Sequence, residues 1–419
     1  MIGVAAAGPV ASRGAASAHV AGGLAASAEG RGWTGLDLAA LEPELETPFW
    51  IAISLVSGVG PVGFARMLRR FGSARAAWAA GSALLDELPR LPDDAVVSLA
   101  RLRREGAAAV AARVQAATRR AGGAVITAMD PAYPSSLGAA DPRPAVLFVA
   151  GDATSMAAPC VAIVGTRRAT GYGRACAAEI ADELARAGVT VVSGLAVGID
   201  AQAHAAAITG GGRSVAVLPS PLDRIYPPRH RDLAARLVAT GGALVSELAP
   251  AHAPGKPDFA RRNRIIAGLA RAVVVVEAPD RSGALLTAAA AVDYGREVFA
   301  VPGPIDAVAS RGCNRLIADH QATIVTSAAS LLHRIGLSPG ARPVSVTSLS
   351  DTEGLVLHAL LQRPASIEEL IGRTRMATGP LASTLTLLEA RGLVESYGGA
   401  TFHPTLVARQ IGRQSVLAG

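Results

Sequence analysis

The chain has 419 residues, of which 50% are hydrophobic but only 4% are aromatic, so its core must be built mainly on small aliphatic side chains. Its formal net charge of +7 favours a polyanionic partner such as nucleic acid, or an anionic membrane surface, over a cationic one. A basic protein without such a partner would carry the same charge, so charge alone assigns no function. The three cysteines, Cys160, Cys176 and Cys313, lack CxxC or cysteine–histidine spacing, which excludes a zinc finger and is typical of the reducing cytoplasm.

Residues 1–47 are rich in alanine, glycine and serine and show no hydrophobic periodicity before Trp33. This composition predicts a disordered or mis-assigned N-terminal extension outside the fold. The segment lacks the basic start of a secretory signal peptide and is interrupted by Arg13 and His19. Apolar runs elsewhere are far shorter than the roughly 18 residues of a membrane-spanning helix, so we expect a cytoplasmic protein without a membrane partner.

A helical domain is predicted for residues 48–123. The stretch FWIAISLVSGVGPVGFARMLRRFGSARAAWAA contains two amphipathic segments joined at GVGP, residues 58–61. This joint resembles a helix-hairpin-helix (SAM-like) element, in which glycine amides at a helix N-terminus hold a DNA phosphate. A simple helical turn with Gly-Pro punctuation explains the same residues equally well.

An α/β domain is predicted for residues 124–335. Short β-branched runs alternate there with helical segments, and the runs are AVIT, AVLFVAG, VAIVGT, VTVVSG, RSVAVLP, GALVSE, AVVVVEA, EVFAVPG and ATIVTS. Strands that are apolar throughout and separated by helices indicate a doubly wound, mostly parallel sheet covered on both faces. The functional residues of such a sheet lie in the loops that follow the carboxyl ends of its strands.

A Pro/Ser-rich linker at residues 336–350 precedes a C-terminal domain at residues 351–407. The pattern there is three helices and a β-hairpin that turns at Gly398 and Gly399, and Ser366 with Glu369 makes a capping box for the second helix. This is the order of a winged-helix domain. Many such domains bind duplex DNA, but Arg391 is the only basic residue of the third helix, which favours docking to a protein.

The loop after the strand VAIVGT has the sequence GTRRATGYG, which lacks the GxGxxG spacing of a dinucleotide site. Gly165 ends the strand, Arg167 and Arg168 occupy the loop, and Gly171 and Gly173 begin the next helix. Backbone N–H groups, a helix dipole and two guanidinium groups together suit phosphate oxygens. The alternative is a tight strand-to-helix turn with solvated arginines.

The segment SGLAVGIDAQAH contains the residue types of a catalytic triad, Ser193, Asp200 and His204. It has no GxSxG elbow, and the aspartate and histidine lie only one helical turn apart. A helix-starting aspartate with a partnered histidine is favoured. We find no third ligand for a metal ion, and we expect no metal and no cofactor.

The stretch GKPDFARRNRIIAGLA combines an aromatic ring with cations and contains Lys256, the only lysine of the chain. Within nine residues it holds Lys256, Phe259, Arg261, Arg262, Asn263 and Arg264. In sites for single-stranded nucleic acid, a ring stacks on a base while cations follow the phosphates. The rival interpretation packs Phe259 into the core and leaves the arginines solvated, but it does not explain the position of the lone lysine.

Other polar residues are expected near the same mouth. Tyr226, Arg229 and His230 lie in a Pro-rich loop, and Asn314 lies at a later helix start. Glu277 ends a strand, Ser282 and Gly283 begin a helix, and Thr287 is expected to be a buried hydroxyl.

In their order and spacing, the motifs VGTRRATGYG, SGLAVGIDAQAH, FARRNRIIAGLA, VVEAPDRSGALLTAAAA, GREVFAVPG and SRGCNRLI resemble the DNA-processing protein A family, also called DprA or Smf. The match runs from about Val125 to Val325. It implies an extended Rossmann-like domain, a homodimer, and a protein that is not an enzyme. Such a protein binds and protects incoming or repair-derived single-stranded DNA and loads the RecA recombinase onto it, in natural transformation or recombination.

By motif, Gly165, Thr166 and Arg167 match the phosphate loop of this family, and Lys256 and Phe259 match its basic and stacking positions. The complete set of expected DNA-binding residues is Gly165, Thr166, Arg167, Arg168, Gly171, Lys256, Phe259, Arg262, Asn263, Arg264, Ser282 and Gly283.

The chain departs from the family pattern at Ala260, at Ser220–Pro221 and in ADHQATIV, residues 318–325. The last departure falls near the expected dimer contact.

Two other functions compete with the resemblance. A nucleotide phosphoribohydrolase would use a PGGxGT loop and a glutamate, and this chain has VPGPID and Glu277 but no PGG. A scaffold whose basic face binds only protein is the other.

Overall fold

The computed structural model of the chain describes residues 33, 35–87, 92–337, 349–390, 393–397 and 401–404. The chain divides into two compact units, residues 1–340 and 341–419, and each is described by itself. Among the described residues, no helix is both long and apolar enough to cross a bilayer.

The first unit begins with a helical region, as the sequence predicts. Its helices are α1 (Pro43–Ser54), α2 (Pro61–Phe71), α3 (Ala74–Ala79), α4 (Ala95–Glu105) and α5 (Ala107–Arg120). Gly60 is the N-cap of α2 and Pro61 opens it, where the missing N–H of proline costs no hydrogen bond. The buried carboxylate of Glu46 accepts hydrogen bonds from the backbone N–H of Ala74 at 2.8 Å and of Arg75 at 3.2 Å, which fixes α3 against α1.

Trp33 belongs to the core of this region, although it falls within the predicted extension 1–47. Its side chain is only 4% exposed and stacks on Phe64 with the ring centroids 5.8 Å apart. The Arg143 guanidinium lies 4.9 Å from the centre of the Trp33 ring. The backbone N–H of Trp33 donates to the Asp141 carboxylate at 2.9 Å. Trp33 therefore joins the helical region to the α/β region.

A nine-stranded sheet forms the centre of the first unit. Its strands are β1 (Gly123–Thr127), β2 (Val146–Gly151), β3 (Cys160–Val164), β4 (Thr190–Ser193), β5 (Ser214–Val217), β6 (Ala243–Ser246), β7 (Ala272–Val275), β8 (Glu297–Ala300) and β9 (Thr323–Ile324). They lie in the order β1-β2-β6-β5-β4-β3-β7-β8-β9. From β6 to β9 all pairs are parallel, whereas β2 pairs antiparallel with both β1 and β6. The predicted doubly wound, mostly parallel sheet is confirmed.

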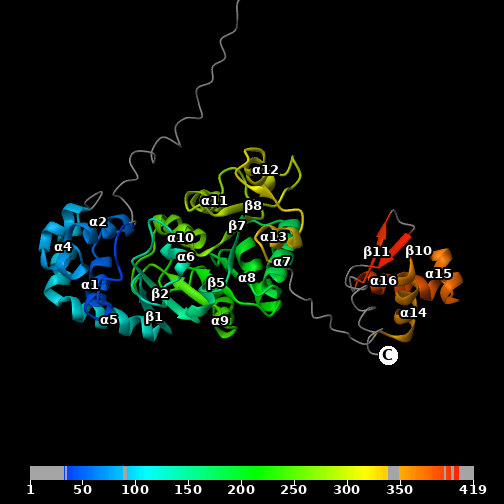
Figure 1. The fold of residues 1–419 in the computed structure, drawn as a ribbon, viewed down its shortest axis with the longest axis horizontal. Coiled ribbons are helices and arrows are strands. Elements are labelled where there is room, and N and C mark those ends of the chain that lie inside the picture. Colours follow the sequence, from blue (N-terminus) through cyan, green and yellow to red (C-terminus); the bar gives the residue numbers. More distant parts are fainter. Residues whose placement is uncertain are drawn as a thin grey trace, which may run out of the picture. The chain divides into compact units, whose positions relative to one another are not determined.

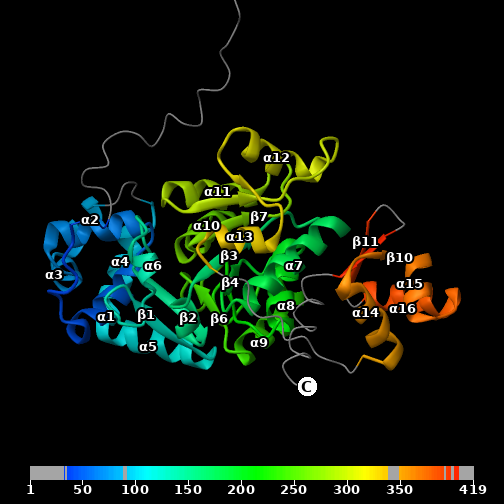
Figure 2. The same ribbon diagram turned by 45° about the vertical axis from the view of Figure 1, so that its right-hand side comes forward.

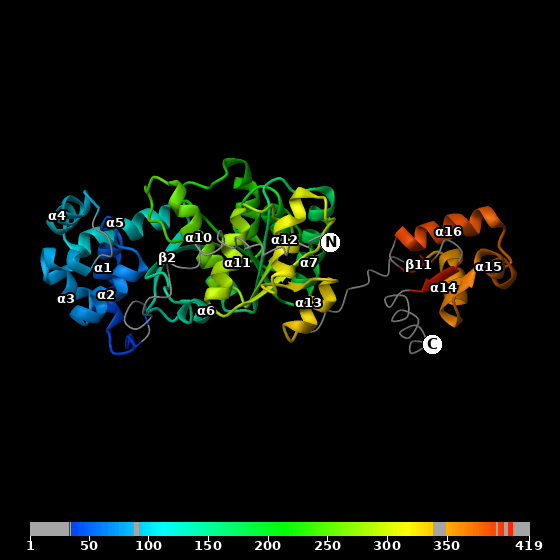
Figure 3. The same cartoon turned by 90° about the horizontal axis from the view of Figure 1, so that it is seen from above.

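Helices cover both faces of this sheet (Figures 1 and 2). They are α6 (Ser135–Gly138), α7 (Gly171–Arg186), α8 (Ile199–Thr209), α9 (Arg231–Ala239), α10 (Lys256–Leu269), α11 (Gly283–Asp293), α12 (Arg311–Ala318) and α13 (Ala328–Arg334). Along β3, Ala162 and Val164 pack toward α10 and α11, while Val161 and Ile163 pack toward α7 and α8. Because neighbouring residues of the strand face opposite sides of the sheet and both sides are covered, both must be apolar. Figure 3 shows α10 and α11 next to one another on their face.

The chain changes direction across the sheet between β3 and β7. From β3 it proceeds through β4 and β5 to β6 on one side, and α10 then returns it to β7 on the other side. The loops after β3 and β7 therefore diverge at their carboxyl ends, which is where open α/β sheets bind their ligands. The predicted phosphate loop after β3 lies at this switch point.

The second unit is a winged-helix domain, as predicted. It contains α14 (Asp351–Gln362), β10 (Ala365–Ser366), α15 (Ile367–Thr374), α16 (Thr378–Ala390), β11 (Val394–Tyr397) and β12 (Thr401–Pro404). Its sheet has the order β10-β12-β11. The capping box of α15 forms between Ser366 and Glu369. Arg391 and the hairpin turn at residues 398 and 399 lie outside the described residues.

The burial of Trp33 generates a first prediction. Trp33→Ala should lower the free energy of unfolding of the first unit by about 3–5 kcal/mol, because the substitution leaves a cavity among aromatic rings. Leu45→Ala on α1 is the control, since that side chain is 50% exposed. Urea denaturation followed by circular dichroism measures both. Equal, small losses would mean that the Trp33 side chain contributes nothing to the stability of the fold.

Candidate functional site

Glu277, just after β7, anchors the loop after β3. Its backbone carbonyl accepts from the N–H of Thr166 at 2.7 Å, and its carboxylate accepts from the N–H of Thr170 at 2.9 Å and from the Thr170 hydroxyl at 2.5 Å. The Thr170 hydroxyl oxygen in turn accepts from the N–H of Gly173 and so caps α7. Glu277 is 2% exposed, and its carboxylate oxygens bind the loop and the start of α7 rather than facing solvent.

Two glycines let the same loop pack directly on α8. A Cβ atom on Gly165 would lie 2.6 Å from the side chain of Ile199. Gly198 has a φ of +88°, and a Cβ there would collide with the carbonyl oxygen of Thr166. The loop is therefore held from below on two sides, while Arg167 and Arg168 between these anchors are exposed.

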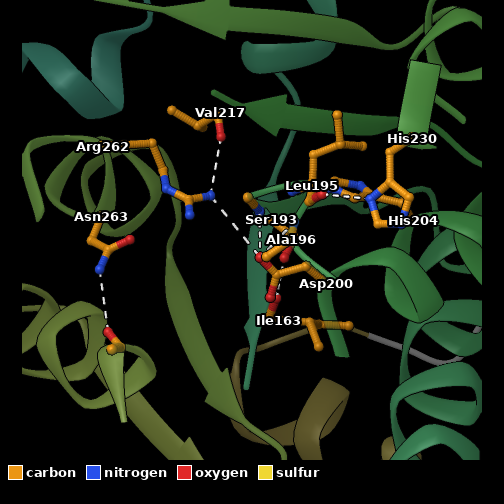
Figure 4. A network of polar contacts seen from close by, with 12 residues as sticks. Ile163, Ser193, Leu195, Ala196, Asp200, His204, Val217, His230, Arg262 and Asn263 are labelled. Atoms are coloured by element: carbon orange, nitrogen blue, oxygen red, sulfur yellow. Dashed lines mark hydrogen bonds and ion pairs between the residues drawn. The ribbon is translucent and has the colours of Figure 1, made fainter. Parts of the chain in front are cut away.

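Asp200 holds the loop that follows β4 (Figure 4). Its carboxylate accepts from the backbone N–H of Gly194 at 3.2 Å and of Ala196 at 3.3 Å, and Leu195 between them has a φ of +56°. A leucine in this left-handed conformation costs free energy, which the two hydrogen bonds offset. Burial raises the pKa of Asp200, and the nearby Arg262 guanidinium opposes that rise.

His204 is part of the fold and not of a catalytic triad. The Ser214 hydroxyl donates to the carbonyl of Val191 at 2.7 Å, so His204 Nδ1–H must donate to Ser214 and Nε2 accepts from the N–H of Leu195. Burial lowers the pKa of His204 to about 3, and the imidazole is neutral. Ser193 donates to the carbonyl of Ile163 at 2.6 Å instead of to the histidine. Asp200 and His204 thus each hold the β4 loop, but they are not partners of one another.

Arg262 lies under the site. Its guanidinium donates to the carbonyl of Val217 at 3.1 Å and lies 4.0 Å from the Asp200 carboxylate (Figure 4). It fills the space that a side chain at Gly194 would need. With 6% of the residue exposed, Arg262 joins the ends of β4 and β5 to α10 and supports the site from below rather than through a direct contact.

The first turns of α10 supply the aromatic ring and the lysine. Phe259 is half-buried, and the Arg167 guanidinium carbon lies 5.3 Å from the centre of its ring. Tyr226 meets the same ring edge-on, with the centroids 5.5 Å apart. Lys256 is exposed at the helix start. Phe259 thus lies partly within the site rather than wholly in the core.

Two connected cavities lie on this surface. One, of about 470 Å³, is lined by Arg167, Gly194, Ala196, Val197, Pro219, Tyr226, Pro227, Pro228, Arg229, Phe259 and Arg262. The other, of about 290 Å³, is lined by Val164, Gly165, Arg167, Ala196, Asp200, Lys256, Phe259, Ala260, Arg262, Asn263, Ile266, Ser282, Gly283, Ala284, Leu286 and Thr287. Arg167 and Phe259 line both. Most residues that the sequence singles out therefore meet at one place, including Ser282, the N-cap of α11, and Asn263, whose amide donates to the carbonyl of Gly283 at 3.2 Å.

Some of the expected site residues lie elsewhere. Arg264 forms an ion pair with Glu247 and donates to the carbonyl of Pro142 at 3.0 Å, so it faces away from these cavities. Thr166 is buried beneath the loop, where its hydroxyl oxygen accepts from the N–H of Arg168. Gly171 is exposed on α7 and lines neither cavity.

The more distant polar residues are also held by the fold. His230 donates to the carbonyl of Leu195 at 2.7 Å, and Asn314 exchanges two hydrogen bonds with the backbone of Gly303. Sequence reasoning missed Arg174 and Arg236, which lie beyond Arg168 on α7 and α9. No motif links them, because only the packing of separate helices brings them together.

The chain is similar to known families and proteins. A family model described as DNA recombination-mediator protein A matches residues 124–336, and one described as DprA winged helix domain matches residues 330–400. Protein Smf of Synechocystis sp. is 31% identical over 396 residues, covering 85% of this chain and 98% of that protein. A putative DNA processing protein DprA of Mycobacterium tuberculosis is 41% identical over 300 residues, covering 67% and 77%. The X-ray structure of DNA processing protein A from Streptococcus pneumoniae aligns with a TM-score of 0.59 at 31% identity, covering 68% of this chain and 97% of that one.

The contact between Glu277 and α7 generates a second prediction. Gly173→Ala should lower the free energy of unfolding by about 1–3 kcal/mol, because the new Cβ would collide with the Glu277 carboxylate. Gly171→Ala is the matched control, since a Cβ there meets nothing within 4 Å. Urea denaturation measures stability, and hydrogen exchange at the Thr170 amide should quicken only in Gly173→Ala. The same behaviour in both variants would show that Glu277 does not anchor the loop.

Proposed function

Because the chain belongs to the DNA recombination-mediator protein A family, also called DprA or Smf, we propose that it binds single-stranded DNA and loads the RecA recombinase onto it. One observation carries the proposal: an aromatic ring, an exposed lysine and an exposed arginine meet in connected cavities at the switch point of the sheet. This combination is that of a site for single-stranded nucleic acid.

Each group has a distinct part in holding the strand. Phe259 stacks on a base, while Arg167 and Lys256 contact phosphate oxygens. Asn263 and the start of α11 at Ser282 and Gly283 form the opposite wall. Asp200 is the only carboxylate among the described residues that line either cavity, and it faces Arg262, so the exposed surface keeps its positive charge.

The recessed position of Phe259 supports a single strand over a duplex. Its ring lies half-buried between Arg167 and Tyr226 inside the cavity walls. A base reaches the ring only if it is turned out of any stack, which a flexible single strand allows at little cost. In a duplex the bases are paired and stacked, so their faces are closed to the ring and only base edges and phosphates are presented.

The geometry supports binding without catalysis. A phosphoribohydrolase would need Glu277 free to act on the substrate, but its carboxylate holds Thr170. Ser193 and His204, the other residues with catalytic potential, are fully buried and bonded to the backbone or to Ser214. We therefore propose a protein of the cytoplasm that protects incoming or repair-derived strands and passes them to RecA.

A second copy of the chain is the expected partner. Exposed apolar side chains lie around the far edge of the sheet, with Ile305 93%, Val308 59% and Ile324 43% exposed. Ile324 is in β9, within the segment 318–325 where the sequence departs from the family pattern. Ile324, exposed on the edge strand, and the exposed Ile305 and Val308 that follow β8 support a homodimer, which would hold one DNA strand at two sites. For the winged-helix domain we propose docking to protein, since α16 carries no lysine or arginine.

Binding of DNA is tested by fluorescence anisotropy with labelled oligo-dT and a matching duplex, across a salt series. Wild type should prefer the single strand. Phe259→Ala should weaken binding by about 1–3 kcal/mol, roughly 5-fold to 150-fold, with an unchanged salt slope. Arg167→Ala should reduce the slope by about 0.7, because one phosphate contact to a single strand is lost.

Arg271→Ala is the control for these variants, since Arg271 is exposed just before the amino end of β7, whereas the cavities lie at the carboxyl ends of the strands. It should bind as wild type does. No preference for the single strand, or equal effects of Arg167→Ala and Arg271→Ala, would refute the assignment of this site.

Loading of the recombinase is a separate prediction. On single-stranded DNA covered by single-strand-binding protein, the chain should accelerate the onset of RecA ATP hydrolysis, and Phe259→Ala should reduce the acceleration as it reduces DNA binding. Arg271→Ala should act like wild type. If wild type binds the strand but leaves the RecA onset unchanged, the loading role is wrong while the DNA site stands.

A further inference from the structure

A third cavity, of about 500 Å³, lies beyond the phosphate loop, between that loop, α8 and α9. Four arginines line it: Arg167, Arg168, Arg174 and Arg236. Its lining residues include no carboxylate and no aromatic ring. It is thus the most strongly cationic of the cavities described, and it lacks the stacking group of the Phe259 site.

The arginines come from three separate elements that the fold brings together. Arg174 lies in the first turn of α7 and donates to the carbonyl of Ala169 at 2.6 Å, which holds it against the loop. Arg236 lies on α9, a helix held in place by the buried residues Ala234 and Leu237. Among the described residues, no carboxylate pairs with any of the four arginines. Four unpaired guanidinium groups repel one another, and a polyanion would relieve this repulsion.

Part of the cavity lining is apolar. Val197 and Ala201 belong to the loop after β4 and to α8, and Leu233 belongs to α9. Cationic and apolar lining together suit a sugar–phosphate backbone, because guanidinium forks bind phosphate oxygens in pairs while apolar side chains contact deoxyribose. Without a ring, the cavity lacks the aromatic platform on which the bases of a single strand stack.

This cavity adjoins the Phe259 site. Arg167 lines all three cavities, and Val197 lines both this one and the cavity of about 470 Å³. A strand whose base lies on Phe259 can therefore pass Arg167 and cross the loop while it stays in contact with positive charge.

We propose that this cavity is a second subsite of the same strand, which takes the phosphates and sugars of the nucleotides that flank the base on Phe259. The inference rests on the proposed function. It assigns Arg174 and Arg236 to phosphate contacts and makes the complete site longer than the Phe259 cavities. It also makes the subsite indifferent to base identity, since only backbone groups are bound there.

The test uses labelled dT oligomers from about 4 to about 16 nucleotides, the range of site sizes known for domains that bind single strands. The full chain is compared with Arg236→Ala and with Arg231→Ala, a control at an exposed arginine of the same helix that does not line the cavity. Arg236→Ala should bind the shortest oligomer as wild type does. It should bind the longest roughly threefold to tenfold more weakly, with a salt slope lower by about 0.7.

The lengths and the stoichiometry separate the possible failures. Equal affinity of Arg236→Ala and Arg231→Ala at every length, or an equal loss at every length, would overturn the subsite. Two short oligomers bound per chain would also overturn it, because the cavity would then take a separate strand. If Phe259→Ala has no effect at any length, the proposed function itself fails. If Phe259→Ala weakens binding at all lengths but Arg236→Ala matches its control, only the subsite fails.

Discussion

The candidate site depends on the carboxylate of Glu277, which joins the two strands between which the chain changes direction. Glu277 follows β7, yet its acceptors are used by Thr166 and Thr170 in the loop after β3. The parallel pairing of β3 and β7 brings these loops together, and the buried carboxylate then fixes how they diverge. Arg167 and the start of α7 owe their positions to this one contact. A group that could have been catalytic therefore serves as an internal brace.

Charge in the molecule is divided between a compensated layer and an uncompensated one. Beneath the loops, Asp200 faces Arg262, and His204 is neutral. Above them, Arg167, Arg168 and Lys256 are exposed, without an ion pair among the described residues. Burying an unpaired charge is costly, so the lower layer must be neutral overall, whereas the upper layer can keep its charge in water for a ligand. The buried network holds the loops in place, and the loops in turn position the exposed cations.

The strands and the place where the singled-out residues meet could be predicted because both depend on local patterns. Apolar runs in VAIVGT and AVVVVEA identify buried parallel strands, and the loops after such strands begin at the same edge of the sheet. The directions of neighbouring side chains could not be predicted. Arg261, Arg262 and Arg264 are consecutive cations in sequence, but each residue of a helix turns by about 100°. Arg261 is exposed, Arg262 is buried under the site, and Arg264 faces Glu247. The burial of Trp33 could not be predicted either, because a single tryptophan in an aperiodic segment gives no hydrophobic pattern.

The position of Lys256 has a consequence for chemistry at this surface. It is the only lysine of the chain and lies exposed at the start of α10, beside Phe259. Every reagent or enzyme that modifies lysine side chains must therefore act at the mouth of the cavities or not at all. Acetylation would remove the single ammonium charge there and leave every arginine unchanged. An amine-reactive label would attach at one internal position. Protection of Lys256 from the label would report directly on whether the cavity is occupied.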